Sequence, residues 1–308
     1  MTLAYSKHLL RQRHAVASLG GSALRAWLAP TPADGAQPPA PPLPGPELIA
    51  RIPPPAAALV RDYLLHVGGD PGVYRGSVPP HLFLQWSLPL AARTLHGLPY
   101  RLLRIVNAGC RIQVGAALDA GAPFTVRARL EGVADDGRRA ALHQRIVTGT
   151  AQNPQALIAD LYTVVPSADG GDRGRNERAA ALRRAEQRVP EGAREIARWS
   201  LARGAGLAFA ALTGDFNPVH WARPYARALG FSGTILHGFA TLARAWEGLH
   251  RARFAGAVDR LRVVDARFLR PLVLPADVGL YLAGSQFFVA GAPGARPYLA
   301  GSFEESAA

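Results

Sequence analysis

The chain has 308 residues, 49% of them hydrophobic, so it can bury a large core and hold two modules. Its single cysteine, Cys110, excludes an internal disulfide and a cysteine-rich zinc site and predicts a reducing compartment, the cytoplasm first and the mitochondrial matrix as the alternative. No charge-free apolar run reaches 18 residues, so no membrane span is expected.

The net charge of +13 comes almost wholly from scattered arginines, and Lys7 is the only lysine. No zinc-finger, RNP-like or helix-turn-helix pattern accompanies this charge, so nucleic-acid binding is not expected. A positive field still favours anionic ligands, such as a phosphate-bearing thiol or an acidic carrier protein.

Two breaks divide the chain. Residues 1–33 lack Asp and Glu but contain basic residues among leucines and alanines, which predicts a basic arm, with a transit peptide as the alternative. The proline-rich run 29–46 predicts an extended linker, and the polar, glycine-rich run 166–194 predicts a connection between domains. The expected segments are an arm and linker at 1–46, an N-terminal module at 47–165, a linker at 166–194 and a C-terminal module at 195–308.

The two modules repeat one pattern. The first contains "DYLLHVGGDPGVYRG" and then "VPPHLFLQWSLPLAARTLHG", and the second contains "LAFAALTGDFNPVHW" and then "TILHGFATLARAWEGLH". Each reads as a short helix into a Gly-Asp turn, followed by a long apolar helix and a run of strands. The sequence therefore predicts two copies of one structural unit, fused in a single chain.

The long helix of the second module indicates how each unit is built. Phe239, Leu242, Trp246 and Leu249 recur at spacings of three and four, which places them on one apolar stripe. The following strands, rich in Val, Leu, Phe and Tyr, supply an antiparallel sheet against which the stripe can pack. One long helix wrapped by such a sheet is a hotdog, so we predict an α+β double hotdog, a fused pseudo-dimer with two long central helices.

The stretch "LTGDFNPVH" places a carboxylate, an amide and an imidazole within the six positions Asp215–His220. A solvated turn accounts for the Gly-Asp and Asn-Pro pairs but not for the histidine. The longer run "AALTGDFNPVHWARPYARALGFSGTILHGFATLA", residues 210–243, closely resembles the signature of the MaoC-like, or hydratase 2, family. That family consists of hotdog-fold (R)-specific enoyl-thioester hydratases and 3-hydroxyacyl-thioester dehydratases, so the resemblance implies a hydro-lyase of fatty-acid metabolism.

The resemblance and the chemistry imply the same catalytic roles. Hydration of an enoyl thioester needs a held water, a base, an acid and a donor to the thioester oxygen. We expect His220 to shuttle the proton, Asp215 to orient the water and exchange the second proton, and the Gly238 N–H to stabilise the oxyanion. Gly238 has an alternative reading, a glycine needed only for tight packing.

Supporting roles are less determined. Asn217 ties the loop to itself or contacts substrate, and His237 contacts substrate or serves as a structural imidazole. Tyr225 and Phe231 form a wall of the acyl site or simply belong to an amphipathic helix. No metal is expected, because Asp215, His220 and His237 include no helical pair of metal ligands, and no cofactor is required.

The first module has lost the motif. Alignment by eye sets Asp70 opposite Asp215, Gly72 opposite the asparagine and Arg75 opposite His220, so this half is expected to be inactive. The missing overhang leaves room for an acyl chain, with Trp86, Leu82 and Phe83 as lining residues or, alternatively, as core.

Two other functions remain open. A hotdog thioesterase shares the fold, but the central helix offers no carboxylate before Glu247. A non-catalytic acyl-thioester binding protein is the other alternative. The expected partner is a CoA or acyl-carrier-protein thioester, and the chain is expected to be a monomeric double hotdog or a homodimer.

Overall fold

The computed structural model describes residues 5, 7–8, 42–100, 105–166 and 187–306. Most of the predicted basic arm and most of both predicted linkers lie outside these residues. The first half contains β1 Leu48–Ile52, α2 Ala57–Val67, η2 Pro71–Val73, β2 Ser77–Val78, η3 Pro80–Leu82, α3 Leu84–Arg93, β3 Val106–Val114, β4 Leu118–Asp119, β5 Phe124–Asp135, β6 Arg139–Gly149 and β7 Leu157–Pro166. The second half contains β8 Arg194–Leu201, α5 Ala205–Thr213, η5 Pro218–His220, α6 Arg223–Ala228, β9 Ile235–Leu236, α7 Gly238–Phe254, β10 Leu261–Phe268, β11 Leu272–Val273, β12 Ala276–Ala283, β13 Gln286–Ala290 and β14 Leu299–Glu305.

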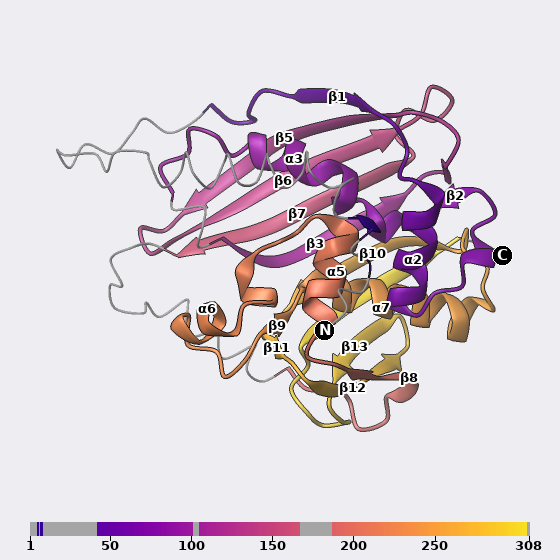
Figure 1. The fold of residues 1–308 in the computed structure, drawn as a ribbon, viewed down its shortest axis with the longest axis vertical. Coiled ribbons are helices and arrows are strands. Elements are labelled where there is room, and N and C mark those ends of the chain that lie inside the picture. The colour runs from indigo at the N-terminus through magenta and orange to yellow at the C-terminus, as the bar shows by residue number, and fades with distance from the viewer. Residues whose placement is uncertain (1–4, 6, 9–41, 101–104, 167–186, 307–308) are drawn as a thin grey trace.

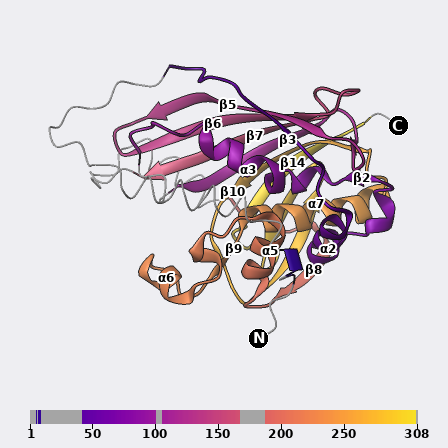
Figure 2. The same ribbon diagram turned by 45° about the horizontal axis from the view of Figure 1, so that its top comes forward.

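Ten of the strands form one continuous sheet with the order β1-β5-β6-β7-β3-β10-β14-β13-β12-β8. The two halves meet at the antiparallel pair β3–β10, where Cys110 lies opposite Ala266. Outward from this pair the halves repeat the same succession, so β7 corresponds to β14 and β1 to β8. The long helices gather on one face of the sheet (Figure 1, Figure 2). This is the predicted double hotdog.

The central helices are unequal. α7 spans 17 residues, whereas α3 spans only 10 and carries Pro89 inside it. The expectation of two long central helices therefore holds for α7 alone. Proline has no N–H for the helical ladder and crowds the preceding turn, which favours a short helix here. Among the described residues, no helix is both long and apolar enough to cross a membrane.

α7 is buried on every side from Phe239 to His250. Its predicted apolar stripe is confirmed, because Phe239, Leu242, Trp246 and Leu249 are all buried in the main core. Its polar residues Arg244, Glu247 and His250 are buried as well, since α2 packs across it while β8, β10, β13 and β14 lie beneath it. Polar groups on this helix must therefore find partners inside the protein.

The loops after α2 and α5 follow the same backbone plan. Each helix ends in a left-handed glycine, Gly68 or Gly214. Each then leads into a 3-10 turn that begins with proline, capped by Asp70 in the first half and by Asn217 in the second. Asp70 is thus the counterpart of Asn217 rather than of Asp215.

This equivalence corrects the alignment made from the sequence. Val73, the last residue of η2, takes the place of His220, and Arg75 lies beyond the turn. Counting from the C-cap glycines, Gly69 takes the place of Asp215. The second half has one extra residue between the C-cap glycine of the helix and the residue that caps the 3-10 turn. An alignment of the two sequences on their Gly-Asp pairs is therefore out of register.

Of the two histidines His220 and His237, only His237 has a counterpart in the first half. The His81 ring packs on Tyr63 with centroids 5.4 Å apart, and the His237 ring packs on Phe209 at 4.9 Å. Tyr63 and Phe209 each lie five residues before their C-cap glycine. His81 is therefore the counterpart of His237.

In the first half, Glu247 of α7 fills the space that corresponds to the surroundings of Asp215 in the second half. Its carboxylate accepts hydrogen bonds from His81 Nε2 at 2.7 Å and from the Tyr74 hydroxyl. A Cβ on Gly69 would lie 2.7 Å from the Glu247 carboxylate. The carboxylate therefore stands where the counterpart of Asp215 would project.

Replacing Glu247 with alanine is expected to lower the unfolding free energy by about 3–5 kcal/mol, because removing one partner strands the others in a buried site. Urea denaturation measures the change. Glu305→Ala is the control, since Glu305 pairs with Arg253 at the surface and such pairs contribute about 0–1 kcal/mol. Equal losses in the two variants would show that the buried network contributes little.

Gly206→Ala is expected to lower the unfolding free energy by about 1–3 kcal/mol, since forcing atoms into a packed site costs this much. A Cβ at Gly206 would overlap the carbonyl oxygen of His220 and push α5 away from η5. Gly204→Ala is the control, because nothing lies within 4 Å of its Cβ. A Gly206→Ala protein with the wild-type urea midpoint would contradict this packing.

Candidate functional site

The loop between α5 and η5 is held by its own polar groups. The Asn217 N–H donates to Asp215 Oδ1, and the Val219 N–H donates to Asn217 Oδ1, both at 3.3 Å. Asn217 therefore ties the turn to itself, in line with the first of its two predicted roles. Its contact with substrate stays a prediction.

His220 is oriented through one of its two ring nitrogens. Nδ1 lies 2.9 Å from the backbone oxygen of Ile235 in β9. A carbonyl oxygen only accepts hydrogen bonds, so Nδ1 carries the hydrogen. Nε2 of the neutral ring then holds the free lone pair, which is the arrangement that a general base requires.

His237 fastens the carboxylate loop to the start of α7. Its Nε2 donates to the backbone oxygen of Asp215 at 3.0 Å and lies 3.9 Å from Asp215 Oδ2. Its ring stacks on that of His220 with the centroids 3.5 Å apart. These contacts favour the structural role predicted as one alternative for His237, and they bring all three side chains together.

Burial sets the charge of both histidines. Loss of solvent lowers the pKa of His220, although the Asp215 carboxylate and the Ile235 carbonyl oppose this shift. Loss of solvent, aided by the neighbouring His220, lowers the pKa of His237 to about 3. Both rings are therefore neutral near pH 7.

One potential ligand atom from each of Asp215, His220 and His237 lies within 4.8 Å of the others. These three side chains could hold a metal ion. The same spacing also suits one water molecule between a carboxylate and an imidazole. His237 already uses Nε2 on the backbone of Asp215, which leaves Asp215 and His220 as the groups best placed to share such a water.

The position of Gly238 fits either of its two predicted readings. It is the first residue of α7, where N–H groups have no partner within the helix and can bind an anionic oxygen. A Cβ at this position would lie 2.8 Å from the Phe268 ring, so packing also demands glycine. The role of the Gly238 N–H toward substrate remains a prediction.

The two residues predicted to form a wall of the acyl site differ in how far they are exposed to solvent. Tyr225, on α6, is 39% exposed, and Phe231 is half-buried. α6 stands away from the sheet at the edge of the molecule (Figure 1). These positions leave their contact with an acyl chain as a prediction.

Trp86 is part of the core of the first half. Its Nε1 donates to Thr148 Oγ1 at 3.1 Å, and its ring meets the edge of Phe124. Leu82 and Phe83 are fully buried too. The structure thus favours the core alternative for these three residues, and their contact with substrate remains untested.

Sequence reasoning missed two residues that shape the site. Ile235 orients His220 through its carbonyl oxygen, which no side-chain pattern reveals. Gly206 lets η5 approach α5, and the signal for it was available, because a glycine within an apolar helical run marks close approach of another backbone.

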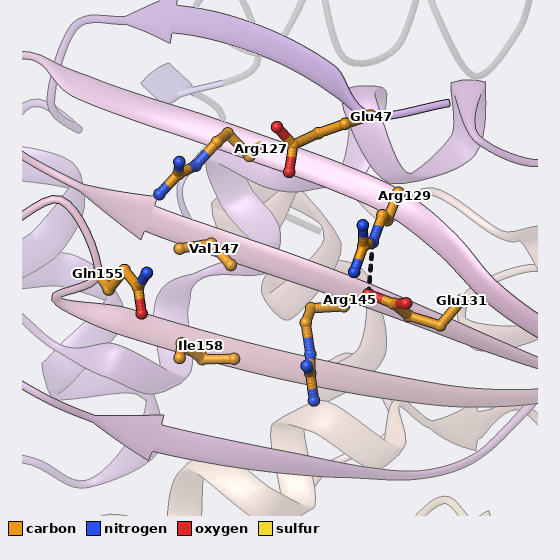
Figure 3. Close-up of a pocket in the computed structure, with 8 residues that line it drawn as sticks. All are labelled: Glu47, Arg127, Arg129, Glu131, Arg145, Val147, Gln155 and Ile158. Atoms are coloured by element: carbon orange, nitrogen blue, oxygen red, sulfur yellow. Dashed lines mark hydrogen bonds and ion pairs between the residues drawn. The ribbon is translucent and has the colours of Figure 1, made fainter. Parts of the chain in front are cut away.

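The outer face of the sheet carries a separate, polar cavity of about 210 Å³. Figure 3 shows Arg127, Arg129 and Glu131 of β5 and Arg145 of β6 projecting into it, with Arg129 paired to Glu131. Buried Val126, Ala128 and Leu130 alternate with these β5 residues and face the helices. The cavity therefore lies on the opposite side of the sheet from the histidines.

A model of the MaoC-like domain matches residues 188–285. 3-Hydroxyacyl-thioester dehydratase X of Mycobacterium tuberculosis is 40% identical over 75 residues, which cover 24% of this chain and 25% of the relative. Probable enoyl-CoA hydratase 2 of Dictyostelium discoideum is 19% identical over 189 residues, which cover 60% of this chain and 63% of the relative. The chain thus spans about a quarter of the length of the M. tuberculosis relative and somewhat under two thirds of the length of the D. discoideum relative.

Solved structures show the likeness of the whole fold. HtdX of M. tuberculosis superposes with a TM-score of 0.65 and 20% identity, covering 85% of this chain and all of its own. A second M. tuberculosis protein, described as a double hotdog, gives 0.53 and 13% identity over 85% of this chain and 96% of its own. The resemblance predicted from the sequence is confirmed: residues 188–285 of this double hotdog chain match the MaoC-like domain.

Proposed function

We propose that the protein is an acyl-thioester hydro-lyase that hydrates trans-2-enoyl thioesters and dehydrates (R)-3-hydroxyacyl thioesters. The observation that carries the proposal is the convergence of Asp215, His220 and His237, each of which brings one potential ligand atom within 4.8 Å of the others. Nδ1 of His220 is bound to the Ile235 carbonyl, which leaves Nε2 as its free ring nitrogen. The MaoC-like domain and the two named relatives support the reaction class. The (R) configuration and the choice between CoA and carrier-protein thioesters belong to the proposal.

The proposed reaction needs one water and no redox step. In hydration, Asp215 orients the water and His220 Nε2 accepts a proton from it while the water oxygen bonds to C3. The electrons of the double bond move toward the thioester, and its oxygen accepts a hydrogen bond from the Gly238 N–H. The acid–base pair then returns one proton to C2, so the elements of water are added across C2 and C3.

The thioesterase alternative would need a carboxylate on the central helix that can reach a hydrolytic water. Glu247 is the only carboxylate on α7, and His81 and Tyr74 already bind it. The binding-protein alternative gives no reason for a buried imidazole with a free ring nitrogen. The geometry therefore favours the hydro-lyase.

The direct test is spectroscopic and uses crotonyl-CoA and a longer enoyl-CoA. Loss of the conjugated thioester absorbance without thiol release is the expected result. Thiol release would indicate a thioesterase, and binding without either change would indicate a scaffold protein. Both of these results contradict the proposal.

Asp215→Ala and His220→Ala are each expected to lower kcat by about 10²–10⁴-fold, the usual contribution of a general acid or base. Enoyl-CoA hydration rates measure the loss, and thermal unfolding checks that the fold survives. Arg75→Ala is the control, because Arg75 lies beyond η2 in the first half. A comparable loss in Arg75→Ala would refute the assignment of the active half.

The pH dependence of hydration should report the lowered pKa of His220. The reaction needs the neutral imidazole, so kcat/KM should stay high above the shifted pKa and fall as the pH drops through it. Because burial lowers this pKa from 6.5, the acid limb should have its midpoint below pH 6.5. A midpoint at or above pH 6.5 would contradict a buried His220 as the base.

A further inference from the structure

Arg244 is a buried cation on the helix that both halves enclose. It lies on α7 with only 7% of its surface exposed. Seven residues, about two turns, separate it from His237, so the two share one side of the helix axis. Burying a guanidinium removes its hydration, and burial accordingly lowers the pKa of Arg244 to about 10.

The described part of the chain offers this charge no counterion. Arg244 Nη1 is buried and has no hydrogen-bond partner there. Glu247, the only acidic residue of α7, is bound by His81 and Tyr74. Tyr63 also interacts electrostatically with Arg244, but burial raises the pKa of the Tyr63 hydroxyl well above its usual value, so it is neutral at pH 7.

His66 adds a second buried polar atom in the same region. Its Nε2 also has no partner among the described residues. His66 lies on α2, which packs against α7, the helix that carries Arg244. Burial and the charge of Arg244 together lower the pKa of His66 to about 3. Tyr5 meets the His66 ring edge-on at 5.7 Å and helps to cover this region.

We propose that Arg244 and His66 form a binding site for a small monovalent anion, of the size of chloride or a carboxylate group. The anion would neutralise the guanidinium and accept hydrogen bonds from Arg244 Nη1 and from His66 Nε2–H. Nitrogen donors of this kind form strong, charge-assisted hydrogen bonds with anions. Chloride and a carboxylate share this chemistry, and the test separates them.

This site is distinct from the proton-transfer site. The Phe209 ring lies next to both, with its centroid 6.4 Å from that of His66 and 4.9 Å from that of His237. The inference does not rest on the proposed hydro-lyase function, because its test measures anion binding and not turnover.

The experiment measures the thermal stability of the full chain in a buffer whose anion is a bulky sulfonate. Sodium chloride or sodium acetate is titrated in at constant ionic strength. A ligand that binds only the folded state raises Tm in a saturable way. Arg244→Met keeps much of the length of the side chain but removes its charge, and Arg61→Met, at an exposed position of α2, is the matched control.

The expected result is a saturable rise in Tm for the wild type and for Arg61→Met, which is lost in Arg244→Met. A rise with acetate alone identifies a carboxylate ligand, and a rise with chloride identifies an inorganic anion. Equal responses in all three proteins, or no saturable response in the wild type, would overturn the proposal.

Two measurements cover the case in which Arg244→Met does not fold. His66→Phe keeps an aromatic ring beside Tyr5 and should weaken anion binding several-fold. Wild-type crystals soaked in bromide should show an anomalous peak beside Arg244 Nη1. Absence of that peak, or unchanged binding in His66→Phe, counts against the site.

Discussion

The burial of α7 from Phe239 to His250 is the constraint on which the rest of the structure depends. A helix that lies on a sheet usually keeps one face in water, but α2 crosses the outer side of α7 and removes that face. Each polar residue of α7 then needs a partner inside the protein. Glu247 is satisfied by His81 and Tyr74, and His250 accepts a hydrogen bond from Trp246 Nε1.

The same burial accounts for the division of labour between the halves. Both halves present a glycine-capped helix, a proline-led turn and a histidine before a central helix. In the second half this frame carries Asp215 and His220, whereas the first half has Gly69 and Val73 in their places. α7 is long enough to bring Glu247 into the space beside Gly69, but the shorter α3 ends at Arg93. A side chain from the second half therefore occupies this space in the first half, which also lacks counterparts of Asp215 and His220.

Much of this arrangement could be predicted from local patterns. The stripe on α7 has the helical period, and the spacing from Asp215 to His220 and on to Gly238 is contained in one uninterrupted segment. The contacts that cross the halves could not be predicted. His81 and Glu247 are 166 residues apart, and nothing in either segment specifies the pairing.

The alignment of the two loops after α2 and α5 could not be predicted correctly from the sequence either. The two Gly-Asp pairs look equivalent as letters, but the backbone aligns the C-cap glycines and the capping side chains instead. One additional residue in the second loop is enough to change which side chain faces the site. The lengths of the central helices also escaped prediction, since Pro89 allows a helix to continue or to end depending on its surroundings.

The stacking of His220 on His237 limits how many protons the site can hold. Two imidazolium rings with centroids 3.5 Å apart would repel each other strongly in a buried setting. His237 is the more deeply buried of the two, and its Nε2 is committed to the Asp215 backbone. In the proposed reaction, a proton taken from water would therefore reside on His220, where the Asp215 carboxylate favours the charge. His237 would stay neutral and hold the loop in place, which would leave a single base in the proposed site.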